Sequence, residues 1–139
     1  MEFDELTIVL TMLRPDAPEL DEEAAEALQN AHMAHLADLH EAGYLLAGGP
    51  LDDPEYRGLS IFNVGPERAR ELRAQDPAVI AGRLSIKVLP WCVPGGAVHF
   101  GPTRFPRSVA EVVRSVAEQA VTDAPHVLDV GPAEPAAQA

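Results

Sequence analysis

Residues 43–64 read Gly-Tyr-Leu-Leu-Ala-Gly-Gly-Pro-Leu-Asp-Asp-Pro-Glu-Tyr-Arg-Gly-Leu-Ser-Ile-Phe-Asn-Val and contain the signals of two consecutive β-strands. Tyr44 to Gly48 is a short apolar run, and Leu59 to Val64 alternates apolar with polar side chains, the period of a half-buried strand. Between them, Gly49-Pro50 and Asp52-Asp53-Pro54 predict a loop with no room for a helix. This stretch therefore predicts a hairpin-like pair of strands.

A strand and a long helix are predicted before this pair. Leu6 to Leu13 is rich in apolar and β-branched residues and predicts a buried strand. Asp16-Ala17-Pro18-Glu19 has the pattern of a helix start, with a capping carboxylate, an early proline and a glutamate three residues after the cap. From Leu20 to Ala42 there is no proline or glycine, and apolar residues recur every three or four positions. We expect one amphipathic helix here, ended by Gly43.

A second helix and a last strand are predicted after the pair. Glu67 to Gln75 predicts a helix that stops near Asp76-Pro77, because the residue before a proline is driven out of helical geometry. Ala78 to Gly82 is expected to bridge to an alternating strand from Leu84 to Leu89. The order strand, helix, strand, strand, helix, strand is the ferredoxin-like βαββαβ arrangement. It predicts an α+β sandwich in which two helices cover one face of a four-stranded antiparallel sheet, while the other face needs a partner.

The last third of the chain has a different character. We assign residues 1–98 to the ferredoxin-like domain and residues 99–139 to a C-terminal extension. Valines spaced along one stripe predict an extra helix at about residues 108–122. Residues 131–139 lack large apolar side chains and predict a disordered tail.

Composition limits the classes of partner. The chain has 139 residues, is 47% hydrophobic and contains no apolar run near the ~20 residues of a membrane-spanning helix. Its formal charge of −12 repels phosphate backbones and anionic lipids, so we expect neither a nucleic-acid nor a membrane partner. The acidic residues 1–5 are unlike an export signal, and a single cysteine, Cys92, fits a reducing compartment. We expect a soluble, cytoplasmic protein.

Several short motifs occur in an order that resembles the YCII-related domain family over about residues 3–94. The motifs are His35-Leu36 with Leu39, the stretch from Gly43 to Leu51, and Asp76-Pro77 with Gly82. The resemblance implies a dimeric α/β barrel, in which two sheets pack face to face and a pocket forms between each sheet and its helices. It also implies a His-Asp pair as the active site, and one branch of the family has a dehydrochlorinase-like activity.

Carried over by position, the resemblance places the pair at His35 and Asp76. His35 lies on the same predicted helical stripe as Leu28 and Leu39, so its imidazole is expected to face the sheet, where it can transfer a proton at neutral pH. Asp76 would orient the ring. Two alternatives stay open, namely that a backbone carbonyl satisfies His35 and that Asp76 is only a helix stop.

Further residues are candidates for contact with a substrate. They are His32, Tyr44, Gly49, Pro50 and Ser60. A basic residue often precedes the histidine in this family, but positions 31 and 32 are Ala and His here, which argues against an anion-holding role at that place. His32, His35 and Asp38 share one helix face, yet no second ligand cluster accompanies them, so we predict no metal site. No phosphate-binding loop or other cofactor motif occurs, and we predict no cofactor.

Two functional hypotheses follow. The first is a small acid-base enzyme that uses a His-Asp pair for the elimination, dehydrochlorination or isomerisation of a small organic molecule. The second is a non-catalytic dimeric small-molecule-binding or accessory module. Both expect a homodimer and a small-molecule ligand.

Overall fold

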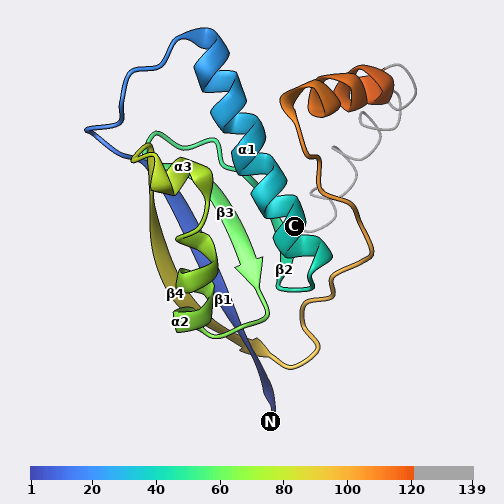
Figure 1. Ribbon diagram of the computed structural model, residues 1–139. Coiled ribbons are helices and arrows are strands. Elements are labelled where there is room, and N and C mark those ends of the chain that lie inside the picture. The colour runs from blue at the N-terminus through green and yellow to red at the C-terminus, as the bar shows by residue number, and fades with distance from the viewer. Residues whose placement is uncertain (121–139) are drawn as a thin grey trace, which may run out of the picture.

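The computed structural model describes residues 1–120, so the predicted end of the C-terminal helix near residue 122 and the predicted tail at 131–139 lie outside the described residues. Within them the chain forms an α+β fold (Figure 1). The elements are β1 (Phe3–Leu13), α1 (Glu22–Glu41), β2 (Leu45–Pro50), β3 (Tyr56–Phe62), α2 (Pro66–Arg73), α3 (Pro77–Ile80) and β4 (Leu84–Pro94).

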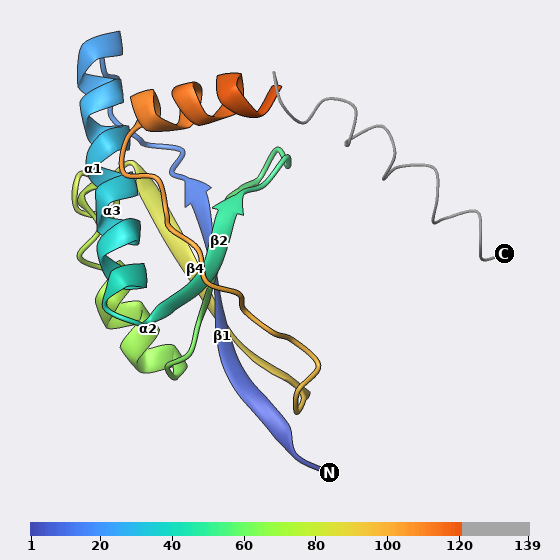
Figure 2. The same cartoon turned by 90° about the vertical axis from the view of Figure 1, so that its right-hand side faces the viewer.

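The four strands form one antiparallel sheet in the order β2-β3-β1-β4. This order is that of a ferredoxin-like fold, in which the first and third strands occupy the centre. Figure 2 shows α1, α2 and α3 on the same side of the sheet. The predicted α+β architecture with a four-stranded antiparallel sheet is therefore confirmed.

The core lies between the sheet and the helices. Along β1, the side chains of Thr7, Val9 and Thr11 are buried, which is the period-2 alternation of a strand with one face against helices. Val9 and Phe62 are completely buried. The main apolar cluster consists of Val9, Leu39, Leu45, Phe62, Ala69 and Leu72.

The first helix begins later than predicted. Its N-cap is Asp21, whose Oδ1 accepts a hydrogen bond from the Ala24 amide at 2.8 Å. The predicted cap, Asp16, instead receives the guanidinium of Arg14, with Nε 2.8 Å from Oδ1. Two capping carboxylates stand five residues apart in the sequence, and the first is occupied by an ion pair, so the helix starts at the second.

The strands extend into segments that were predicted as loops. The antiparallel pairing of residues 43–64 is confirmed, but β2 continues to Pro50, which lies opposite Gly58. Pro50 is tolerated because β2 is an edge strand, where a missing N–H costs no ladder hydrogen bond. β4 likewise continues to Pro94 and pairs with the start of β1, so that Cys92 lies within this strand, where it is exposed.

A short helix, α3, replaces the predicted bridge after Asp76. Asp76 is its N-cap, with Oδ1 accepting a hydrogen bond from the Ala78 amide at 2.8 Å, and Pro77 occupies the first turn. Proline is well suited to that position because its missing N–H has no partner there anyway. The Asp-Pro pair that predicted a helix stop therefore also starts the next helix.

The chain after β4 returns to α1 and packs along it. Residues 109–120 are helical, and the preceding residues cross to the C-terminal half of α1 (Figure 1). The guanidinium of Arg107 reaches Asp38 at 2.6 Å and Glu41 at 2.8 Å, and the ring of Phe105 stacks on His40 with centroids 4.4 Å apart. We call residues 103–107 the strap. No helix within residues 1–120 is both long enough and apolar enough to cross a membrane.

Candidate functional site

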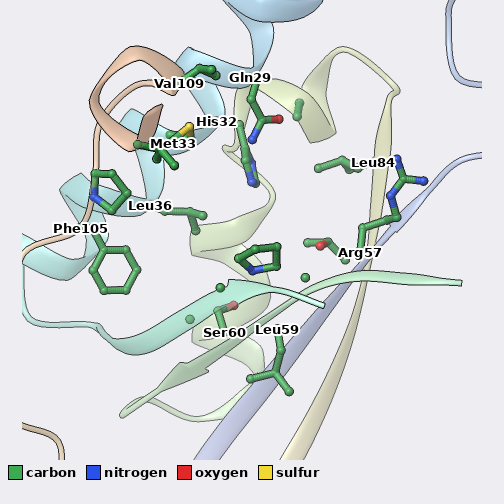
Figure 3. Close-up of a pocket in the computed structure, with 18 of the residues that line it drawn as sticks. Gln29, His32, Met33, Leu36, Arg57, Leu59, Ser60, Leu84, Phe105 and Val109 are labelled. Atoms are coloured by element: carbon green, nitrogen blue, oxygen red, sulfur yellow. The ribbon is translucent and has the colours of Figure 1, made fainter. Parts of the chain in front are cut away.

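A pocket of about 520 Å³ lies between α1, the β2-β3 edge of the sheet and the strap (Figure 3). Its volume is within the range of small-molecule sites. Apolar side chains from α1, the strap and the C-terminal helix form much of the wall. The polar lining residues are Thr11, Gln29, His32, Arg57, Ser60, Arg73 and Arg83.

The centre of the pocket is formed by His32, whose imidazole extends from α1 toward the strand that carries Ser60 (Figure 3). Its Nδ1 lies 2.6 Å from Oδ2 of Asp76 at the start of α3. Asp76 is fully buried, whereas the side chain of His32 retains 14% exposure. A histidine at the pocket surface is thus held from behind by a carboxylate that solvent does not reach.

The Asp76 carboxylate is held in its ionised form. Burial on its own raises the pKa of Asp76, but the hydrogen bond from His32, the charge of Arg73 and the Ala78 amide together lower it to about 2. An ionised carboxylate accepts hydrogen bonds and donates none, so Nδ1 of His32 must carry the proton. In the neutral ring this leaves Nε2 as a proton acceptor. Nε2 has no hydrogen-bond partner among residues 1–120, so it is free for a ligand.

Arg73 completes this buried group. It is 1% exposed, and its Nη1 lies 2.8 Å from the same Oδ2 of Asp76. Its Nε has no partner among the described residues. Arg73 and Asp76 are three residues apart, at the end of α2 and the start of α3, so the turn between these helices brings the two charges together. We call His32, Arg73 and Asp76 the buried triad.

His35 occupies a different environment from the one predicted. It does not line the pocket, and Asp76 accepts its hydrogen bond from His32 instead. Burial lowers the pKa of His35, with Asp76 and the nearby Leu72 carbonyl acting in the opposite direction. Its Nε2 is buried and has no hydrogen-bond partner within residues 1–120. Residues three apart on a helix share a face but sit about one turn apart, and Asp76 at the start of α3 bonds the histidine of the earlier turn.

The other predicted contact residues divide into two groups. Gly49, Pro50 and Ser60 line the pocket, from the β2-β3 edge. Tyr44 does not line it, and packs against the apolar core with the Arg68 guanidinium 5.4 Å from its ring centroid. Asp38, which shares a helix face with the two histidines, is paired with Arg107. No cluster of three or more metal-ligating side chains occurs within residues 1–120.

The sequence did not predict the arginines that line the pocket or its aromatic residue, Phe105. Arg57, Arg73, Arg83 and Phe105 all line the pocket, although they come from four separate segments. Only Arg73 had a local signal, since an Arg three residues before an Asp matches the spacing of a helical ion pair. The other three reach the pocket through tertiary packing alone.

Comparison with known proteins identifies the family. The fold and the pocket define a ferredoxin-like protein with a histidine-carboxylate pair at the sheet-helix interface. The family model of the YCII-related domain matches residues 8–92, which is more than half of the chain. The chain therefore belongs to the YCII-related domain family, as its motifs predicted.

Solved structures that align with the chain include two of low identity. A 5-chloro-2-hydroxyhydroquinone dehydrochlorinase from Burkholderia phenoliruptrix AC1100, in complex with 2,5-dihydroxybenzoquinone, is 21% identical, with 62% of this chain and 92% of that chain covered and a TM-score of 0.46. A dimeric protein of unknown function and ferredoxin-like fold from Bacteroides fragilis NCTC 9343 is 19% identical, with 63% and 93% covered and a TM-score of 0.37. No curated protein matches the chain.

Proposed function

We propose that this protein is a small acid-base enzyme in which Nε2 of His32 takes a proton from a small organic substrate. The observation that carries the proposal is the 2.6 Å hydrogen bond between a pocket histidine and a fully buried, ionised carboxylate. This arrangement fixes both the orientation and the tautomer of the ring, which is what a general base requires. Asp76 is a positioning residue, because it lies behind the histidine.

The chemistry that suits this pocket is proton abstraction followed by elimination or isomerisation. In an elimination such as dehydrochlorination, the substrate C–H proton moves to Nε2, the C–H electron pair forms a double bond, and the leaving group departs with its own bonding pair. In an isomerisation, His32 returns the proton to a different atom. Both routes need one base and a cavity that shields the reacting atoms from water. We assign the catalytic role to His32 rather than to the predicted His35, because His35 is outside the pocket.

The assembly that we propose is a homodimer formed through the uncovered face of the sheet. Ile8 lies opposite Ile61 on one side and Leu89 on the other, and these side chains alternate with the inward-facing Val9. None of the three labelled helices lies on this face (Figure 2). An apolar sheet face of this kind is stabilised by packing against a second copy. Light scattering tests the assembly, with Ile8→Glu expected to give monomers.

The experiment that tests the enzymatic function is the substitution His32→Asn. The asparagine amide can still donate to Asp76 in place of Nδ1, but nothing replaces Nε2. Candidate reactions are followed by NMR in D2O, as deuterium uptake into enolisable lactones, and by chloride release from chlorinated phenols. We expect any activity of the wild type to fall by about 10²-fold or more in His32→Asn.

The matched control is His35→Asn, one turn further along the same helix. Since His35 lies outside the pocket, its variant is expected to keep most of the activity. Equal losses in the two variants would contradict the assignment. The absence of activity with every candidate substrate would favour the second function, a dimeric small-molecule-binding module. The observation in favour of that alternative is that the buried triad also joins α1, α2 and α3 and therefore has a structural use without turnover.

A further inference from the structure

The charge of the pocket is opposite to the charge of the chain. The sequence has 22 acidic and 10 basic side chains, yet the pocket is lined by Arg57, Arg73, Arg83 and His32, and by no Asp or Glu of the described residues. Three of the ten cations therefore gather at one cavity of an acidic protein. Cavity walls of low dielectric focus such a charge toward the ligand.

One of these three arginines is already neutralised. Arg73 is buried against Asp76, so the two formal charges cancel within the buried triad. Arg57 and Arg83 form no ion pair with any residue in the range 1–120. The net positive charge of the pocket therefore comes from Arg57 and Arg83.

Both free arginines are placed by irregularities of the backbone at one end of the sheet. In the pairing with β1, Thr11 lies opposite Gly58 and Met12 lies opposite Tyr56, so Arg57 is the extra residue of a β-bulge. In a regular strand Arg57 would face away from Gly58 and Ser60. A bulge removes this alternation and redirects the side chain, which is a common use of bulges beside binding sites.

Arg83 reaches the same end from the other neighbour of β1. Gly82 has a φ of 77°, a left-handed conformation that glycine adopts without strain, and it turns the chain from α3 into β4. The Arg83 amide then donates to the Ala78 carbonyl at 3.0 Å, and its carbonyl accepts from the Arg14 amide at 2.9 Å. The backbone of Arg83 is therefore fixed, directly before the Leu84–Leu13 pair that ends the β1-β4 ladder.

The opposite end of the pocket is apolar. In Figure 3, Met33, Phe105 and Val109 lie on one side of His32, and Arg57 and Leu84 lie on the other. Val112 and Val113 extend the apolar wall. A ligand that fills this cavity has to present an apolar body to one end and negative charge to the other, with the proton-transferring Nε2 between them.

We propose that the ligand of this pocket is a small organic anion, of about the size of one substituted ring, whose carboxylate or phenolate oxygen binds Arg57 and Arg83. This proposal deepens the proposed function, and rests on it for the claim that the bound anion is a substrate. Guanidinium groups suit the task because they stay charged at any relevant pH and bind oxyanions through paired N–H donors. The apolar body then lies against Met33 and Phe105.

The experiment compares acids with uncharged amides of the same shape. The probes are benzoate and benzamide, 4-chlorobenzoate and 4-chlorobenzamide, and 2,5-dihydroxybenzoate and its amide, titrated into 15N-labelled protein at low salt. We expect each acid to bind about tenfold or more tightly than its amide. The double variant Arg57→Gln/Arg83→Gln is expected to lose this preference while its amide binding is unchanged. The acid preference is also expected to weaken as salt is added.

The matched control removes two arginines from outside the pocket. Arg68→Gln/Arg70→Gln changes the net charge equally on the exposed surface of α2 and should leave the acid preference intact. Equal binding of acids and amides would overturn the proposal, as would an acid preference that survives in Arg57→Gln/Arg83→Gln. Failure of every acid to bind at 10 mM would overturn it as well.

Measuring ligand binding and turnover separately distinguishes a failure of the anion-site proposal from a failure of the proposed enzymatic function. Binding of the acids that depends on Arg57 and Arg83 but occurs without turnover would support the anion site and contradict the enzymatic function. Turnover that depends on His32 but not on the two arginines would support the enzymatic function and contradict the anion site. The His32→Asn variant is expected to keep its acid preference, since Nε2 carries no positive charge in the neutral ring.

Discussion

The middle and the C-terminal end of α1 each hold a neighbouring element through ion pairs, but with different consequences. In the middle of the helix, His32 contacts Asp76, which also binds Arg73, in a group that is almost completely buried. At its C-terminal end, Asp38 and Glu41 bind Arg107 of the strap, with side chains that are 42–67% exposed. Buried charges leave a large penalty when one partner is lost, whereas exposed pairs contribute little because water and salt replace them. Burial, and not the number of ion pairs, therefore decides which contacts hold the site.

The largest expected effect is that of Asp76→Ala. The substitution leaves Arg73 buried without its counter-charge and removes the cap of α3, so the free energy of unfolding should fall by about 3–5 kcal/mol. Urea denaturation followed by circular dichroism measures the change. The control is Arg73→Met/Asp76→Leu, which removes both charges and should recover much of the loss. A decrease below about 1 kcal/mol in Asp76→Ala would show that the triad is not buried in solution.

The second-largest effect is expected from acid, which protonates Asp76 and so weakens the buried triad. The pKa of Asp76 is about 2 in the folded chain against an ordinary value of 3.8, so the folded state binds this proton more weakly than the unfolded state. The stabilisation is therefore complete above pH 3.8 and disappears as the pH falls through about 2, with a loss of about 2 kcal/mol. Urea denaturation at pH 5 and at pH 2 tests this. In Asp76→Asn the difference between the two pH values should shrink by that amount.

An intermediate effect is expected where the strap contacts the apolar core. Phe105 is half-buried, stacks on His40 and lines the pocket, so Phe105→Ala should lower the free energy of unfolding by about 1 kcal/mol. Hydrogen exchange should increase in residues 103–107 while the sheet remains protected. Phe105→Leu, which keeps much of the apolar volume, is the control. Unchanged exchange in the strap would mean that its backbone is held by other contacts.

The smallest effect should come from Arg107→Gln, which removes the exposed ion pairs at the C-terminal end of α1. Both ion pairs of Arg107 are lost, but their carboxylates return to water, so the midpoint of thermal unfolding should shift less than in Phe105→Ala. The remaining difference from wild type should vanish in 0.5 M NaCl, because salt screens exposed charges. A shift that is as large as that of Asp76→Ala would refute the view that burial decides.

Much of the fold follows from local patterns. The stripe of apolar residues on α1, the apolar run of β1, the alternation in β3 and β4 and the turn signals after β2 are each set by neighbours in the sequence, so they predict the element order and the antiparallel sheet. Element boundaries were less predictable, because they depend on competition between contacts. Asp16 and Asp21 are both able to cap a helix, and the ion pair of Asp16 with Arg14 is what leaves that role to Asp21.

The candidate site followed from the sequence only in part. The residue types were predicted, since His32, Asp76, Gly49, Pro50 and Ser60 were all candidates, and all but Asp76 line the pocket while Asp76 supports it from behind. The pairing was not predicted, because His32 and His35 share a helix face and only the position of α3 selects between them. His35 lies about 4.5 Å further along the helix axis and feels the charge of Asp76, but the hydrogen bond is made by His32.

The sequence by itself therefore determined the order of the elements, the topology of the sheet, the net charge and the family. The tertiary structure decided which histidine meets Asp76, and it brought Arg57, Arg83 and Phe105 to one pocket from segments far apart in the chain. The physical reason is the range of each effect. Hydrophobic periodicity and capping act within a few residues, whereas the position of a side chain in a pocket depends on the packing of helices against the sheet, to which the whole chain contributes.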